Sequence, residues 1–190
     1  MAKNKIEKNN IGFPKNQGLY DSSNEHDSCG VGFIVDTKNH ASHDIVNKGL
    51  SMLCNLEHRG AVGADPKAGD GSGILIQLPH EFFKKEINHF DLPNQNEYAV
   101  GVFFLKKDNQ LKDKILKKIE DVCLKENIPF LGWRLCPTYE EELGWSVKPT
   151  TPYVYHLFVG KPDNILNQDD FERKIYVLRQ CIDKEIMKMG

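Results

Sequence analysis

The chain has 190 residues, 39% of them hydrophobic and 27% charged, which is typical of one soluble globular domain. Its formal net charge is only −2, so neither nucleic acid nor an anionic membrane is expected as a partner. No apolar run approaches the roughly 20 residues that a membrane-spanning helix needs.

Cysteine usage indicates a reducing compartment. The five cysteines are widely spaced along the chain, and none belongs to a Cys-x-x-Cys pair. This argues against a disulfide framework and against a cysteine-rich zinc site. Residues 1–10 are polar and include an acid, unlike a secretory signal. We therefore expect a cytoplasmic protein.

The first half of the chain predicts a polar leader followed by ordered elements. Residues 1–28 are rich in Asn, Lys and Ser and predict a leader without a core of its own. The run from Cys29 to Val35 is apolar and β-branched and predicts a buried strand. Ser42 suits the N-cap of a helix that continues to about His58. A glycine-rich loop over 60–73 then leads into a predicted strand at 74–78.

The second half predicts strands mixed with amphipathic helices. Pro79 suits the first turn of a short helix that carries an aromatic pair. Further strands are predicted at 98–105, 130–135 and 153–159, and amphipathic helices at 109–126 and 168–189. This mixture favours an α+β domain built from packed layers. The chain stops directly after a helix, so we expect the domain to be incomplete.

Cys29 is the candidate nucleophile, because it lies where the polar leader meets the apolar run. Cleavage between Ser28 and Cys29 would place a thiol and a free α-amine on one residue. An α-amine has a pKa of about 7.7–8.0, close to the ~8.5 of a thiol, and can act as its general base. Gly30 and Gly32 leave room for a substrate to approach the backbone. The alternative is a buried structural cysteine at the start of a strand.

Two other patterns in this region could suggest metal or phosphate binding. Asp70 and its glycines lack the Gly-Lys-Ser/Thr of a P-loop, and Lys67 and Gly69 stand where an EF-hand needs acids. A tight turn beside the nucleophile is the better interpretation. A set of His26, Cys29, His40 and His43 imitates a zinc site, but its spacing is not that of a zinc finger.

Four motifs together resemble the class II glutamine amidotransferase domain of glutamate synthases. They are Cys-Gly-Val-Gly-Phe at 29–33, His-Arg-Gly-Ala at 58–61, Gly-Asp-Gly-Ser-Gly-Ile-Leu at 69–75 and Pro-His-x-Phe-Phe at 79–83. The resemblance implies an Ntn-hydrolase αββα four-layer sandwich, here incomplete, with residues 1–28 as a propeptide and 29–190 as the N-terminal portion of the amidotransferase domain.

The same resemblance implies an activity and its residues. Cys29, exposed by cleavage after Ser28, would hydrolyse glutamine to glutamate and ammonia through a thioester, with Gly30 and Arg59 in the active-site architecture. Arg59 is also explained as a cation at a helix C-terminus. The complete enzyme would carry FMN and an iron–sulfur cluster, whereas this segment is expected to bind no cofactor. The implied partners are glutamine and the rest of the large subunit.

The resemblance also implies other groups of the glutamine site, from later in the domain, and these have no match between residues 106 and 190. They are an Asn-Gly pair for the oxyanion hole, an arginine for the substrate carboxylate and an aspartate for its amino group. Loss of one oxyanion-hole donor typically costs a factor of about 10²–10³ in rate, so the chain alone should be almost inactive. Two alternatives remain, another class II amidotransferase or a non-catalytic assembly module.

Overall fold

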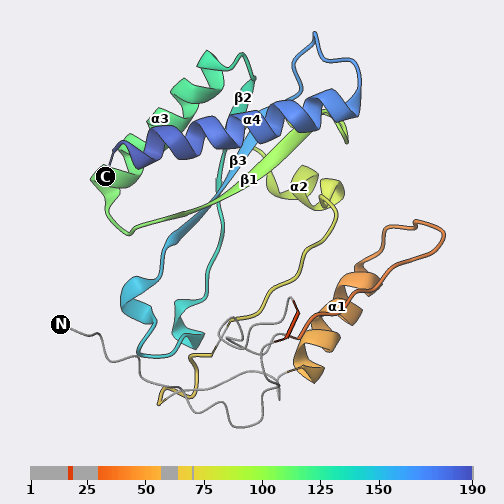
Figure 1. The fold of residues 1–190 in the computed structure, drawn as a ribbon, viewed down its shortest axis with the longest axis vertical. Helices are drawn as coiled ribbons and strands as arrows, with labels where there is room; N and C mark the ends of the chain where they lie inside the picture. Colours follow the sequence, from red (N-terminus) through yellow and green to blue (C-terminus); the bar gives the residue numbers. More distant parts are fainter. Residues whose placement is uncertain (1–16, 19–29, 57–63, 70, 190) are drawn as a thin grey trace. The chain divides into compact units, whose positions relative to one another are not determined.

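The computed structural model describes residues 17–18, 30–56, 64–69 and 71–189 (Figure 1). The chain divides into two compact units. Unit 1 consists of Met1–Ala61 and Asp70–Gly73, and unit 2 of Val62–Gly69 and Ile74–Gly190. Within the described ranges, no helix is both long and apolar enough to cross a lipid bilayer.

Unit 1 contains the predicted first helix, α1, which spans His43–Asn55. Ser42 is its N-cap, with an extended backbone (φ −149°, ψ 150°), and Leu56 is its C-cap. The predicted end near His58 lies outside the described residues. The apolar face predicted for the helix is its less exposed face, formed by Ile45, Val46, Gly49, Met52, Leu53 and Leu56.

Two predicted strands are wrong where the structure describes them, residues 30–35 and 74–78. Neither segment has strand structure. Val31 is 91% exposed and Leu75 fully exposed. An apolar, β-branched sequence indicates that a segment can pair and be buried, but a strand forms only when a neighbour accepts its hydrogen bonds. No described strand pairs with either segment.

Unit 2 is built on a three-stranded antiparallel sheet in the order β1-β3-β2. The strands are β1 (Tyr98–Leu105), β2 (Phe130–Leu135) and β3 (Tyr153–Gly160), and they confirm the predictions. Since β1 and β2 both run antiparallel to β3, they are parallel to each other. Parallel strands need a crossover connection, and the helix α3 (Asn109–Lys125) provides it.

The two long helices of unit 2 begin and end at sequence signals. Asp108 caps α3 by accepting a hydrogen bond from the Leu111 N–H at 3.0 Å. Asn167 caps α4 (Gln168–Met187) by accepting from the Asp170 N–H at 2.8 Å. After α3, Asn127 adopts a left-handed conformation with φ 53°. The Ile128 N–H then reaches the Cys123 carbonyl at 2.9 Å, which completes a Schellman motif.

One face of the sheet packs against α3 and α4 (Figure 1). Alternate strand residues point to this side, as the two-residue period of a strand requires. Leu157 and Val159 of β3 join Ile119 and Val122 of α3 in the cluster. α4 completes it with Leu178 and Ile182, so this core contains the predicted inward faces of both helices.

The opposite face of the sheet is covered only in part. The short helix α2 (His80–Glu86) and the segment after it pack there around Phe158, which is fully buried. On the same side, Val102 is 52% and Phe104 69% exposed. The α+β class is therefore confirmed, while the described residues form one sheet of the two that a four-layer sandwich contains.

Candidate active site

Most residues predicted for the active site lie outside the described part of the chain. These are Ser28, Cys29 and Arg59. Gly30 is the exception, and it is the first described residue after the candidate nucleophile. The geometry of unit 1 can therefore be followed from the residue next to Cys29.

Gly30 lies against the C-terminal end of α1. A Cβ added to Gly30 would meet both Cδ atoms of Leu56 at 3.3 Å, and one added to Gly32 would approach Met52 Cε at 2.8 Å. Both glycines thus allow a close approach of the backbone to the helix. Leu56 stands three residues before Arg59 in the sequence. Unit 1 thereby brings the neighbour of Cys29 to the helix end that precedes Arg59.

Two of the other cysteines are poorly suited to nucleophilic chemistry. Cys123 is fully buried, and burial raises the pKa of its thiol to about 11. Burial also raises the pKa of the Cys136 thiol, an effect that nearby Arg134 opposes only in part. Because the thiolate is the reactive form of cysteine, neither environment activates its sulfur.

The glycine-rich loop contains a feature that the sequence did not reveal. Asp65 is 5% exposed, and it accepts hydrogen bonds from Ser146, 81 residues later, and from the Lys67 N–H. The Ser146 backbone N–H is the main cause that holds the pKa of Asp65 below its ordinary value. The Ala68 N–H donates to the Asp65 carbonyl at 3.0 Å and closes a turn at 65–68. The tight turn predicted around Asp70 falls on a residue outside the described part of the chain.

A histidine with an unusual environment lies on β3. His156 Nδ1 is buried and has no hydrogen-bond partner within the described chain. Burial, with a further contribution from Arg134, lowers the pKa of His156. Arg134 itself pairs with Glu86 at 3.1 Å. His156 is therefore a neutral, packed side chain at neutral pH.

Of the four residues that imitate a zinc site in the sequence, the structure describes His40 and His43. His43 Nδ1 contacts the Asn47 amide at 3.1 Å, and His40 Nδ1 lies 3.9 Å from Asp36. The described ranges contain no group of three or more His, Cys, Asp or Glu side chains placed to hold a metal ion.

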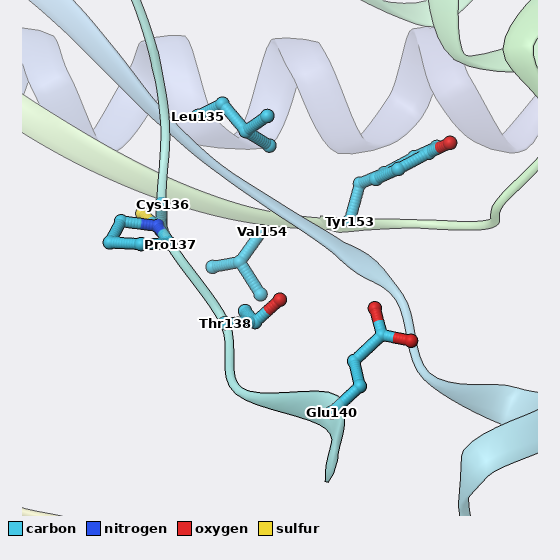
Figure 2. A pocket seen from close by; sticks show the side chains of 7 residues that line it. All are labelled: Leu135, Cys136, Pro137, Thr138, Glu140, Tyr153 and Val154. Carbon is cyan, nitrogen blue, oxygen red and sulfur yellow. The ribbon is translucent and has the colours of Figure 1, made fainter.

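A hollow in unit 2 lies beside the end of β2 and the start of β3. Figure 2 shows Thr138, Glu140 and Tyr153 around it, with the apolar side chains of Leu135 and Val154. Glu140 is already paired with Lys107.

Comparison with known proteins identifies the family. Residues 29–190 match the family model of class II glutamine amidotransferases. The chain is 43% identical over 169 residues to the glutamate synthase [NADPH] large chain of Bacillus subtilis, a match that covers 88% of this chain and 11% of the relative. It is 40% identical over 180 residues to glutamate synthase [NADH] of Saccharomyces cerevisiae, covering 88% of this chain and 8% of the relative.

A third relative is named for a different electron donor, ferredoxin. Ferredoxin-dependent glutamate synthase of Pyropia yezoensis is 39% identical over 164 residues, which are 85% of this chain and 10% of the relative. The chain thus spans only about a tenth of the length of these relatives. The family match extends over most of this chain, from Cys29 onward. The chain belongs to the class II glutamine amidotransferases.

Proposed function

We propose that residues 29–190 are the N-terminal portion of the glutaminase domain of a glutamate synthase large subunit, and that residues 1–28 are its propeptide. The observation that carries this proposal is the family match, which begins at Cys29, the first residue after the polar leader. Removal of the leader would make Cys29 the N-terminal residue. Its thiol and α-amine would then act together on glutamine.

The reaction follows from these two groups. The α-amine takes the thiol proton, and the sulfur attacks the side-chain carboxamide carbon of glutamine. Collapse of the tetrahedral intermediate breaks the C–N bond, and the departing nitrogen takes a proton and leaves as ammonia. Water then attacks the γ-glutamyl thioester, which restores the thiol and releases glutamate. Ammonia passes to the synthase part of the enzyme for the synthesis of glutamate from 2-oxoglutarate.

The geometry of unit 1 supports a site at this end of the chain. Gly30 packs against Leu56, so the positions next to Cys29 and shortly before Arg59 are close in space. We assign Arg59 to the architecture of the site, where its five fixed donors would hold backbone carbonyls around the nucleophile. Gly30 gives the substrate access to the backbone after Cys29.

The partly open sheet face supports the fold that this function requires. Val102 and Phe104 point to the side of the sheet that α3 and α4 do not cover, and both remain exposed. In an αββα sandwich, the second sheet packs on this side and removes such side chains from water. We therefore assign the three-stranded sheet to one of the two central layers, with α3 and α4 as an outer layer.

The redox part of glutamate synthesis is assigned to the remainder of the large subunit. FMN and an iron–sulfur cluster would supply electron transfer there. The described residues of this chain place no three potential metal ligands together. The relatives name NADPH, NADH and ferredoxin as donors at similar identities of 39–43%, which supports a shared role before the redox step.

The test uses the complete synthase in two forms, wild type and Cys29→Ala. Intact-mass measurement of the wild type should show the loss of residues 1–28. Cys29→Ala should abolish glutamate synthesis from glutamine but leave synthesis from added ammonia intact, because ammonia bypasses the glutaminase step. Glutamine use by Cys29→Ala at the wild-type rate would overturn the proposal. Retention of Met1 together with unreactive Cys29 would indicate the non-catalytic module instead.

A second measurement concerns this chain by itself. Without the later groups of the glutamine site, the isolated and processed chain should turn over glutamine at least about 10²-fold more slowly than the complete enzyme. Robust turnover by the isolated chain would contradict the assignment of those groups to the rest of the domain.

A further inference from the structure

The two edges of the three-stranded sheet differ in how they are protected. β2 forms one edge, and neighbouring side chains shield it. The His89 ring donates a hydrogen bond to the Trp133 carbonyl at 2.9 Å, and an added Cβ at Gly132 would stand 2.6 Å from Phe90 Cε1. The pairing of β2 with β3 is also irregular between Phe130 and Gly132. Covering groups and irregularities of this kind keep an edge strand from pairing further.

β1 forms the other edge, and it is regular and apolar. Its eight residues pair with β3 in one unbroken register, and β3 is the one described strand beside it. The sequence of β1 contains no charged residue and no proline. Val102 is 52% and Phe104 69% exposed. A long, apolar and regular edge of this kind is ready to pair with another strand.

The backbone hydrogen bonds show which residues of β1 face the open edge. The Val154 carbonyl of β3 accepts from the Cys136 N–H at 2.8 Å, so Val154 directs its backbone groups toward β2. Its partner on β1 is Phe104, and this is therefore a non-hydrogen-bonded pair. Phe104 directs its own N–H and C=O away from β3. Because this pattern repeats every second residue, Val102 and Val100 do the same.

The order of the elements resembles a known supersecondary motif. Apart from two short 3₁₀ turns, the chain from β1 to α4 follows the order β-α-β-β-α. These are five of the six elements of the split β-α-β motif, which ends with a further strand. Both helices pack on the same face of the sheet (Figure 1). The connection from β1 through α3 to β2 passes over β3, which lies between the two strands.

The handedness of such connections indicates where a further strand would join. Crossovers between parallel strands of one sheet are almost always right-handed. β3 runs opposite to β1, while α4 covers the same face as α3. A right-handed crossover from β3 must therefore lead in the direction opposite to the one from β1, away from β2. β1 already occupies the place next to β3 on that side, so the first free place is the outer edge of β1.

We propose that the outer edge of β1 is a strand-addition site, and that its occupant is the first extended segment after α4 in the complete glutaminase domain. This inference rests on the proposed function, in which residues 29–190 are the N-terminal portion of that domain. The added strand is antiparallel to β1 and parallel to β3. It exchanges backbone hydrogen bonds with Val100, Val102 and Phe104 and extends the sheet to four strands, while β2 remains an edge.

Hydrogen–deuterium exchange of the complete synthase, resolved to single residues of β1, tests the strand addition. The amides of Gly101 and Phe103 face β3 and are protected in either case. With a fourth strand, the amides of Val102 and Phe104 should also exchange at least about 100-fold more slowly than in an unstructured peptide. Protection that alternates along β1, with Val102 and Phe104 exchanging freely, would overturn the inference.

Disulfide mapping in the complete synthase identifies the added strand. Phe104→Cys provides an exposed thiol at the open edge, and Leu135→Cys provides the control on β2, where the side chain is 53% exposed. Single cysteines are placed along the first predicted strand after α4. One of them should cross-link to Phe104→Cys, because paired residues of antiparallel strands lie within disulfide reach, and none should cross-link to Leu135→Cys. Cross-linking to Leu135→Cys, or none to Phe104→Cys, would exclude this occupant.

A proline substitution decides the question if the cysteine variants do not fold. Val102→Pro removes the outward N–H, whereas Val102→Ala keeps it with a similarly small side chain. Proline is tolerated at such a position on an edge strand but not inside a sheet. The unfolding midpoint of Val102→Pro should therefore be at least about 5 °C below that of Val102→Ala, and equal midpoints would overturn the inference. The exchange pattern can also be measured in the inactive Cys29→Ala synthase, so this inference and the proposed function can fail independently.

Discussion

Ser146 binds the Asp65 carboxylate through its backbone N–H and its hydroxyl, both at 2.8 Å from Oδ2. The two residues are 81 positions apart and lie in segments without regular secondary structure. The contact therefore holds two loops of unit 2 together, and it consists of hydrogen bonds to a charge, which are stronger than those between neutral groups.

This contact predicts a specific dependence of stability on pH. The hydrogen bonds, with that from the Ser146 N–H as the largest cause, hold the pKa of Asp65 below its ordinary value of 3.8. As the pH falls below that value, the unfolded chain binds a proton while folded Asp65 stays ionised. The ionised Asp65 carboxylate therefore stabilises the fold fully above pH 3.8. This stabilisation is lost as the pH falls from 3.8 through the lower pKa of Asp65 in the folded protein.

Urea denaturation of wild type and Asp65→Asn at several pH values measures this effect. The difference in the free energy of unfolding between the two proteins should be largest at neutral pH and should shrink below about pH 4. Ser146→Ala keeps the backbone donor and should retain most of the pH dependence. A difference that is constant from neutral to acidic pH would contradict the role of the Asp65 charge.

Replacement of glycine by alanine should have opposite effects on stability at Gly132 and at Gly49. A Cβ at Gly132 would come within 2.6 Å of Phe90 Cε1, whereas one at Gly49 meets nothing within 4 Å. Gly132→Ala should lower the free energy of unfolding by about 1–3 kcal/mol, because the aromatic ring must move. Gly49 is inside α1, so Gly49→Ala should raise helix stability by up to about 1 kcal/mol. Thermal melts that show no difference between the two variants would refute this contrast.

The sequence predicted the helices and strands after residue 79 closely, because their signals are local. The strands at 98–105 and 130–135 have the predicted bounds, and Asp108 and Asn167 begin the long helices as capping residues should. The wrong strands at 30–35 and 74–78 have the same apolar character. What differs is the presence of a pairing neighbour, which is a property of the whole fold.

The candidate site shows the same limit of sequence patterns. Cys29 and the motifs after it could be recognised because they follow one another in the chain. Asp65 could not be linked to its partners, because Ser146 and Gly144 follow about 80 residues later in an irregular connection. No periodic pattern reports such a contact. The glycines of this loop predicted only a tight turn around Asp70, and the hydrogen-bonded carboxylate of Asp65 appeared only in three dimensions.

Truncation to alanine should lower the free energy of unfolding much more at Ile119 than at Leu124, although both residues lie on α3. Ile119 is fully buried between the sheet and α4, while Leu124 is 77% exposed. Ile119→Ala should lower the free energy of unfolding by about 3 kcal/mol, from lost burial and the cavity that remains. Leu124→Ala should cost less than about 1 kcal/mol. Urea denaturation checks both, and equal effects would contradict the assignment of the core to this face of α3.

Thiol labelling is predicted to separate Cys123 from Cys54. Cys123 is fully buried, and burial raises its pKa to about 11, whereas Cys54 is exposed. At neutral pH a thiol with that pKa is ionised in fewer than about one molecule in a thousand, and only the thiolate reacts. A maleimide should therefore label Cys54 in the native protein, and Cys123 only after denaturant is added.

Peptide mapping by mass spectrometry distinguishes the two positions. Ile119→Ala tests whether burial causes the low reactivity of Cys123, because Ile119 belongs to the same buried cluster. The cavity left by the isoleucine should admit water and reagent more often, so that Cys123 is labelled faster than in wild type while Cys54 is not. If Cys123 in the native wild type reacted as fast as Cys54, desolvation would not control its reactivity.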